Sequence, residues 1–107
     1  MLGISADQVS LSVQQSAASL AQAQGCAEYA LLKLRQSPSY AGGEIRTLGV
    51  GTCEVLTIGG IGNNNRSVCA EGKTGEAIRR VEIAVSQILP HTTVYSWQEV
   101  AVFTLCE

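Results

Sequence analysis

The stretch that decides the fold is Val13–Leu34, which reads VQQSAASLAQAQGCAEYALLKL. Apolar or small side chains recur along it at alternating steps of four and three residues, and one polar residue interrupts them. The members of this stripe are Val13, Ala17, Leu20, Gln24, Ala27, Leu31 and Leu34. A repeat near 3.5 residues is typical of a helix with one apolar face. The pattern predicts a helix from Ser5 to about Gln36.

The predicted helix ends at Ser37-Pro38-Ser39, because the residue before a proline disfavours the helical region. A helix of about 30 residues is about 45 Å long, which is more than a domain of this size covers. We therefore expect one end of the helix to project. Cys26–Leu34 is the more apolar half and is expected to pack on the core, whereas the half up to Gln24 is rich in small residues.

Beyond Gly43 the chain changes to short runs of strand-forming residues separated by Gly and Asn. Along Ala77–Val85, apolar residues alternate with Arg80 and Glu82, which is typical of an antiparallel sheet with one covered face. The predicted strands are Glu44–Leu48, Cys53–Ile58, Arg66–Glu71, Ala77–Val85 and Thr92–Trp97, with a sixth candidate at Val100–Leu105. Gly59–Asn65 and Gly72–Gly75 are predicted to be hairpin loops, since their residues tolerate positive φ.

These elements predict an α+β fold. Residues 1–107 form a single domain in which a long N-terminal α-helix (residues 1–36) packs on a small antiparallel β-sheet (residues 44–107). The main aromatic group is Tyr95, Trp97 and Phe103. We expect it in the core, because aromatic side chains usually fill the core of a domain that has few of them. The predicted core members are Leu31, Leu34, Val81, Ile83, Val85, Trp97 and Phe103.

The composition excludes several classes of protein. Of the 107 residues, 46% are hydrophobic and only 15% are charged, whereas disordered chains are rich in charge and poor in apolar residues. The formal net charge of −2 argues against a nucleic-acid binder, which usually presents a basic face. The sequence has no apolar run of about 18 residues, the length that crosses a membrane. Met1-Leu2-Gly3-Ile4 is too short to be the apolar segment of a signal peptide.

The four cysteines indicate disulfides and not a metal site. They are 27, 16 and 37 residues apart, whereas metal and redox sites need close pairs. Of the three connectivities we favour Cys26–Cys53, which joins the helix to the sheet, and Cys69–Cys106, which holds the end of the chain. Four buried free thiols are the alternative. Disulfides imply an oxidising compartment, and since no export signal is visible we expect an export or membrane segment upstream of Leu2.

No group of residues in the sequence has the pattern of a catalytic site. His91 is the only histidine and Asp7 the only aspartate, and they are far apart in the chain, so a catalytic triad is not expected. We expect His91 in an exposed loop. Several carboxylates are scattered over the strands and are interpreted as solvent-facing: Glu44, Glu54, Glu71, Glu76, Glu82 and Glu99. The sequence therefore predicts no enzyme, no metal site and no cofactor.

Four segments of the chain resemble the PilX-like minor pilins, which are small proteins of type IV pilus assembly. They are Gly25–Leu34 (GCAEYALLKL), Pro38–Gly43 (PSYAGG), Gly51–Cys53 (GTC) and Ser96–Ala101 (SWQEVA). The resemblance spans most of the range Ala21–Phe103. It implies a pilin-like fold, a membrane-inserted N-terminal helix before assembly, and an extracellular place in a pilus on the cell surface. The partners it implies are other pilin subunits, the pilus assembly machinery and, through the missing N-terminal segment, the membrane.

On this resemblance the chain is expected to be a structural subunit, a minor pilin, that assembles through its N-terminal helix. The small residues of Ser5–Gln24 would let neighbouring helices approach closely. We expect the helix-assembly face at Val13, Ala17 and Leu20.

The sheet domain is then expected to be exposed, and its loops Gly59–Asn65 or His91–Thr93 to contact a surface or DNA. The competing interpretation is a secreted, disulfide-stabilised binding or adhesion module without a filament role. The sequence upstream of Leu2 discriminates the two, because about 20 apolar residues there would favour the pilin.

Overall fold

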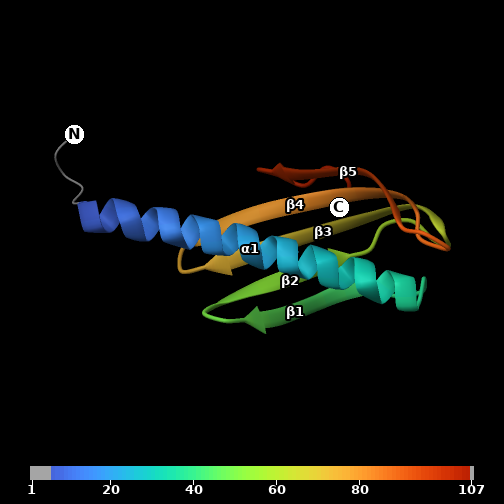
Figure 1. Cartoon of the computed structure of the whole chain (residues 1–107), viewed down its shortest axis with the longest axis horizontal. Coiled ribbons are helices and arrows are strands. Elements are labelled where there is room, and N and C mark those ends of the chain that lie inside the picture. The colour runs from blue at the N-terminus through green and yellow to red at the C-terminus, as the bar shows by residue number, and fades with distance from the viewer. Residues whose placement is uncertain (1–5, 107) are drawn as a thin grey trace.

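The computed structural model describes residues 6–106 of the chain, with the backbone alone for residues 6–12 and 48. The described elements are α1 (Ala6–Gln36), β1 (Gly42–Leu48), β2 (Gly51–Thr57), β3 (Asn64–Thr74), β4 (Ala77–Gln87) and β5 (Thr93–Val100). The strands form one antiparallel sheet in the order β1-β2-β3-β4-β5, so each strand pairs with the next one in the chain (Figure 1). The predicted α+β class is confirmed.

Helix α1 has 31 residues and ends where the sequence predicted, while Ser5 lies outside the described residues. The N–H of Ser37 donates the last helical hydrogen bond to Lys33 O at 2.8 Å, and Pro38 follows. Lys33 and Arg35 occupy the last turn, where positive charge offsets the negative end of the helix dipole. The molecule is 53 Å long, and the N-terminal end of α1 extends past the sheet (Figure 1).

The helix face that meets the sheet differs from the predicted stripe. Its buried residues are Ser19, Gln22, Ala23, Cys26, Ala27, Ala30 and Leu34. Of the predicted stripe, only Ala27 and Leu34 are buried, and Leu20 and Leu31 pack at the margin of the core. The packed part of α1 therefore begins well before Cys26, and its contact face is rotated toward small side chains.

Gly72 of β3 explains why small side chains form this contact. A Cβ at position 72 would lie 2.0 Å from Ser19 O and 2.6 Å from Ala23 N, so the helix backbone rests directly on the strand. The predicted hairpin loop Gly72–Gly75 is therefore wrong for its first residues. Strand β3 continues to Thr74, and the turn lies at residues 75 and 76.

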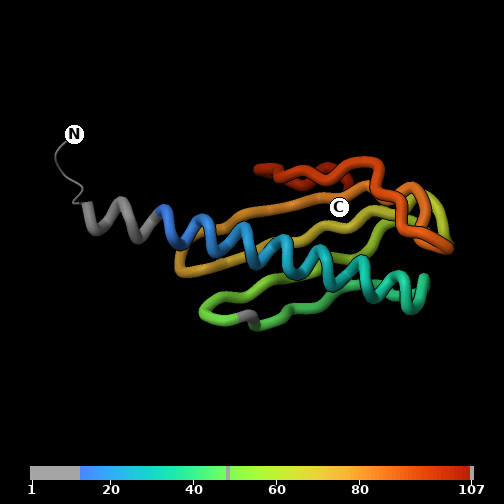
Figure 2. Tube along the Cα trace, viewed as in Figure 1, coloured from blue at the N-terminus to red at the C-terminus, as the bar shows by residue number. Residues whose placement is uncertain are grey.

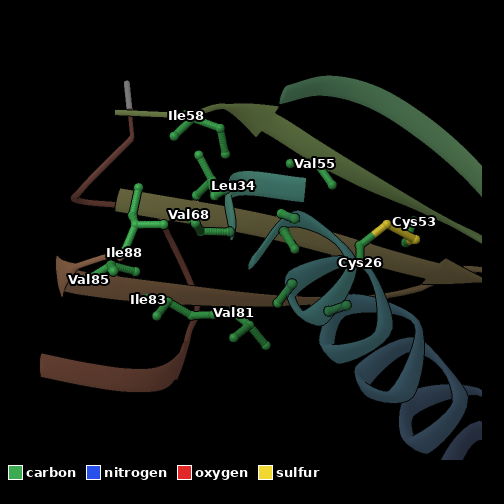
Figure 3. Packing of buried hydrophobic residues seen from close by; sticks show 14 residues of the cluster. Cys26, Leu34, Cys53, Val55, Ile58, Val68, Val81, Ile83, Val85 and Ile88 are labelled. Carbon is green, nitrogen blue, oxygen red and sulfur yellow. A yellow bond between two sulfur atoms is a disulfide. The ribbon is translucent and has the colours of Figure 1, made fainter. Parts of the chain in front are cut away.

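The core lies between α1 and the inner face of the sheet (Figure 3). Leu34, Val81, Ile83 and Val85 are buried in it, in agreement with the sequence analysis. Its other buried members are Ala23, Cys26, Ala27, Ala30, Cys53, Val55, Ile58, Val68, Ala70 and Ile88. Leu31 is only half-buried at the margin, because its side of the helix turns away from the sheet.

The predicted aromatic core is wrong. Trp97 pairs with Ile83 across β4 and β5, so its side chain lies on the inner face. Helix α1 contacts β1 to β4 but, within the described residues, not β5. Trp97 therefore stays 39% exposed, and Tyr95, at a bulge in β5, is 82% exposed. Phe103 is half-buried.

The sixth candidate strand, Val100–Leu105, is also wrong. Apart from Val100, which ends β5, its residues have no regular structure. The segment 101–106 instead returns over the outer face of the sheet, where Cys106 is bonded to Cys69 of β3 (Figure 2). This segment gives the sheet a second cover, opposite α1.

Candidate functional site

The predicted helix-assembly face lies where α1 leaves the sheet. Val13 is 64% exposed and Ala17 is exposed, whereas Leu20 is half-buried against the core. Between Asp7 and Glu28 the sequence of the helix has no charged residue. The side of α1 that carries Val13 and Ala17 can therefore approach another apolar surface without burying a charge.

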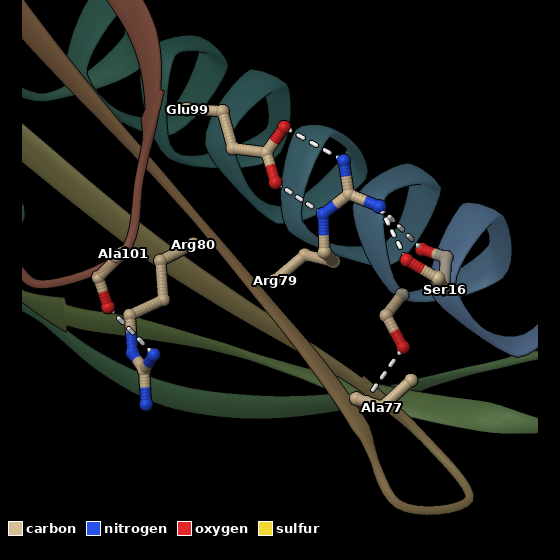
Figure 4. A network of polar contacts seen from close by, with 7 residues as sticks. Ser16, Ala77, Arg79, Arg80, Glu99 and Ala101 are labelled. Carbon is tan, nitrogen blue, oxygen red and sulfur yellow. Dashed lines mark hydrogen bonds and ion pairs between the residues drawn. The ribbon is translucent and has the colours of Figure 1, made fainter.

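A polar network anchors α1 at the edge of this face. Arg79 of β4 forms an ion pair with Glu99 of β5 and donates from Nη1 to Ser16 Oγ at 2.5 Å (Figure 4). Ser19 Oγ donates to Ala77 O at 2.8 Å. The hydrogen bond from Arg79 lowers the pKa of Glu99 below its ordinary value. One arginine thus joins the helix to the last two strands, at the point beyond which α1 projects.

Glu82 of β4 was interpreted as solvent-facing, and this is wrong. It is 1% exposed, because the segment 101–106 covers it. Its carboxylate accepts hydrogen bonds from Thr104 N at 3.0 Å, Thr104 Oγ1 at 2.8 Å and Leu105 N at 3.2 Å. Burial raises the pKa of Glu82, but these hydrogen bonds outweigh it and hold the pKa below its ordinary value. The Cys69–Cys106 disulfide attaches the same segment to β3.

A second polar cluster, which the sequence analysis missed, joins the end of α1 to β1. The hydroxyls of Tyr29 and Tyr40 donate to the Glu44 carboxylate at 3.1 and 2.5 Å, and the Arg46 guanidinium lies 3.9 Å from the centre of the Tyr29 ring. The hydrogen bond from Tyr40 lowers the pKa of Glu44. Burial of the Tyr40 hydroxyl and its hydrogen bond to Glu44 raise the pKa of Tyr40. The strand alternation alone gave no sign that these side chains meet.

The two loops that were expected to contact ligands lie side by side. Asn63 of the first loop is hydrogen-bonded to Leu89, two residues before the second loop: its Nδ2 donates to Leu89 O and its Oδ1 accepts from Leu89 N, both at 2.8 Å. Ile61 and His91 are exposed. The prediction of an exposed His91 is confirmed, and no ligand of these loops follows from the contacts alone.

Among residues 13–47 and 49–106, no three His, Cys, Asp or Glu side chains come together in a way that could hold a metal ion. Within residues 6–106 no helix is long and apolar enough to cross a membrane.

Both disulfides of the structure, Cys26–Cys53 and Cys69–Cys106, are the pairs that the sequence analysis favoured. Two disulfides in a small domain are typical of a secreted or extracellular protein. No family model, no curated protein and no solved structure matches the chain. What the fold defines is therefore a class: a disulfide-stabilised α+β domain with a projecting helix.

Proposed function

We propose that this protein is a structural subunit of a type IV pilus or a related filament, and that it is a minor pilin. It assembles through its N-terminal helix, with the sheet domain exposed on the filament. The observation that carries the proposal is the stretch of α1 between Asp7 and Glu28, which has no charged residue and on which Val13 and Ala17 are exposed. The resemblance of four sequence segments to PilX-like minor pilins and the two disulfides also support it.

The proposed assembly depends on close helix packing. Small side chains let two helix backbones approach each other, and Ala17 lies in a run of Ala and Ser residues. A charged side chain on this face would have to be buried between subunits, which is unfavourable without a partner of opposite charge. The same substitution on another exposed side of the helix would stay in solvent.

The test compares Ala17→Arg with Leu32→Arg in the full product of the gene, expressed in its native host. Leu32 is exposed on the packed half of α1, so it is the matched control. We expect the wild-type protein and the Leu32 variant in membrane and sheared-filament fractions, and the Ala17 variant in the membrane only. Equal recovery of both variants in filaments would contradict helix-mediated assembly.

A secreted binding or adhesion module is the second candidate. The observation that favours it is the neighbouring pair of loops that the bonds of Asn63 to Leu89 hold together, the first of which exposes Ile61. Secretion of the full gene product into the medium without any filament or membrane fraction would select the module over the pilin.

A further inference from the structure

Arg66, near the start of β3, is a buried arginine held by backbone groups. It is 6% exposed. Its Nε donates to Gly59 O at 2.9 Å, and its Nη1 donates to Pro38 O at 2.8 Å and to Gly62 O at 2.7 Å. These hydrogen bonds fix the guanidinium between the α1–β1 connection and the β2–β3 loop. The two N–H groups of Nη2 are not part of them.

The positive charge of Arg66 has no ionic partner among residues 13–47 and 49–106, whose side chains the structure describes. The ion pairs there are Arg79–Glu99, Arg80–Glu71 and Lys73–Glu71. Backbone carbonyls satisfy N–H donors, but none of them carries a full negative charge. A buried charge is costly unless an opposite charge accompanies it, so the surroundings of Arg66 are suited to an anionic group.

A hollow of about 360 Å³ opens between the same two connections and includes Arg66 in its lining.

 Pro38, Tyr40, Ile58 and Ile61 are among the residues that line this hollow. Arg66 is the one charged residue in the lining of the hollow. Glu44, which accepts a hydrogen bond from the Tyr40 hydroxyl, does not line it. Pockets of about 300–1,000 Å³ with apolar walls and a few polar groups are typical of small-molecule sites.

We infer that this hollow binds a small organic carboxylate. The carboxylate group lies on the Arg66 guanidinium, whose planar N–H groups suit a carboxylate. The apolar body of the ligand packs between Ile58 and Ile61. A fully hydrated inorganic anion would satisfy the charge but leave these walls without a partner.

The inference goes beyond the proposed filament role. The hollow adjoins Pro38, which follows the C-terminal end of α1, whereas Val13 and Ala17 lie toward the opposite end of the helix (Figure 1). Ligand binding at Arg66 and assembly through the helix can therefore be tested separately, and either can fail without the other.

The test is an NMR titration of amide chemical shifts with three probes: benzoate, benzyl alcohol as its neutral match, and inorganic phosphate. We expect benzoate to give saturable shifts confined to residues 38–41, 58–62 and 66, with a dissociation constant about tenfold below those of both other probes. Equal binding of benzyl alcohol would overturn the inference, because the hollow would then recognise only apolar surface. Equal binding of phosphate would overturn it as well, in favour of a general anion site.

A pair of variants at the rim tests the charge without disturbing the fold. Ile61 is 91% exposed, so Ile61→Glu and its neutral match Ile61→Gln are both expected to fold. The added carboxylate should weaken benzoate binding about fivefold relative to Ile61→Gln, because like charges repel across the hollow. Arg66→Gln should abolish benzoate binding, but it also removes hydrogen bonds that hold the two connections together. The decisive comparison is therefore between Ile61→Glu and Ile61→Gln. Equal affinity of the two Ile61 variants would refute the proposed site.

Discussion

On the inner face of the sheet, α1 covers β2 to β4 with a row of small, buried side chains, and the contact is apolar. On the outer face, the segment 101–106 covers β3 and β4 mainly by hydrogen bonds to one buried carboxylate, that of Glu82. Each cover is fixed by one disulfide. The inner cover should therefore respond to changes in side-chain volume, and the outer cover to changes in protonation.

The largest effect is expected for Leu34→Ala, on the inner face. Leu34 is fully buried, and truncating a buried leucine leaves a cavity that costs about 2–5 kcal/mol. Urea denaturation monitored by circular dichroism measures the change in the free energy of unfolding. Leu32→Ala, at an exposed position two residues earlier, is the control and should cost far less. Similar losses for the two variants would show that α1 does not pack as described.

The next effect is expected for Gly72→Ala, which adds a methyl group where helix and strand touch. Because this group would meet the backbone at Ser19 and Ala23, the helix must shift, at a cost of about 1–3 kcal/mol. The control is Ser67→Ala, which changes the outer face of β3, the strand that contains Gly72. Gly43→Ala is not a suitable control, because Gly43 has positive φ. A Gly72 variant as stable as the wild type would contradict the direct backbone contact.

The outer face is tested by Glu82→Gln and by acid. The amide keeps the shape of the carboxylate but not its charge, so we expect a loss of about 1–2 kcal/mol at pH 7. The pKa of Glu82 is lowered in the folded protein, so its contribution is complete above the ordinary value and is lost as the pH falls through the lowered value. Unfolding free energies measured between pH 7 and pH 3 should therefore converge for variant and wild type.

This convergence isolates Glu82, because Glu44 and Glu99 also have lowered pKa values and affect both proteins alike. A constant difference between variant and wild type at every pH would contradict the described role of the Glu82 charge.

The sequence predicted the regular elements well, because they depend on local patterns. Pro38 ended the helix, and the alternation in Ala77–Val85 placed the apolar residues of β4 on the inner face. The segment 101–106 could not be predicted in the same way. It has no periodic pattern, and its position depends on the Cys69–Cys106 bond and on contacts with Glu82, which lie far away in the sequence.

Two of the errors, at Gly72 and Trp97, have a common physical cause. Gly72 and Trp97 were assigned from residue type, Gly72 to a turn and Trp97 to the core. Their roles depend instead on where α1 lies over the sheet: it presses on β3 at Gly72 and leaves β5 uncovered at Trp97. The helix pattern indicated an apolar stripe, but which side would meet the sheet depended on the small residues that allow close contact.

The smallest effect is expected for Val13→Ala, and it tests whether the projecting part of α1 differs from the packed part. Val13 is 64% exposed, so its truncation should change the free energy of unfolding of the monomer by no more than about 0.5 kcal/mol. Amide hydrogen exchange should show the same division, with fast exchange before about Gln15, which lies against Gly75, and protection from Ser19 onward. Uniform protection along the whole helix, or a Val13→Ala loss as large as that of Leu34→Ala, would mean that this part of α1 is packed within the monomer. The exposed face would then be unavailable to a second subunit, and helix-mediated assembly would lose its structural basis.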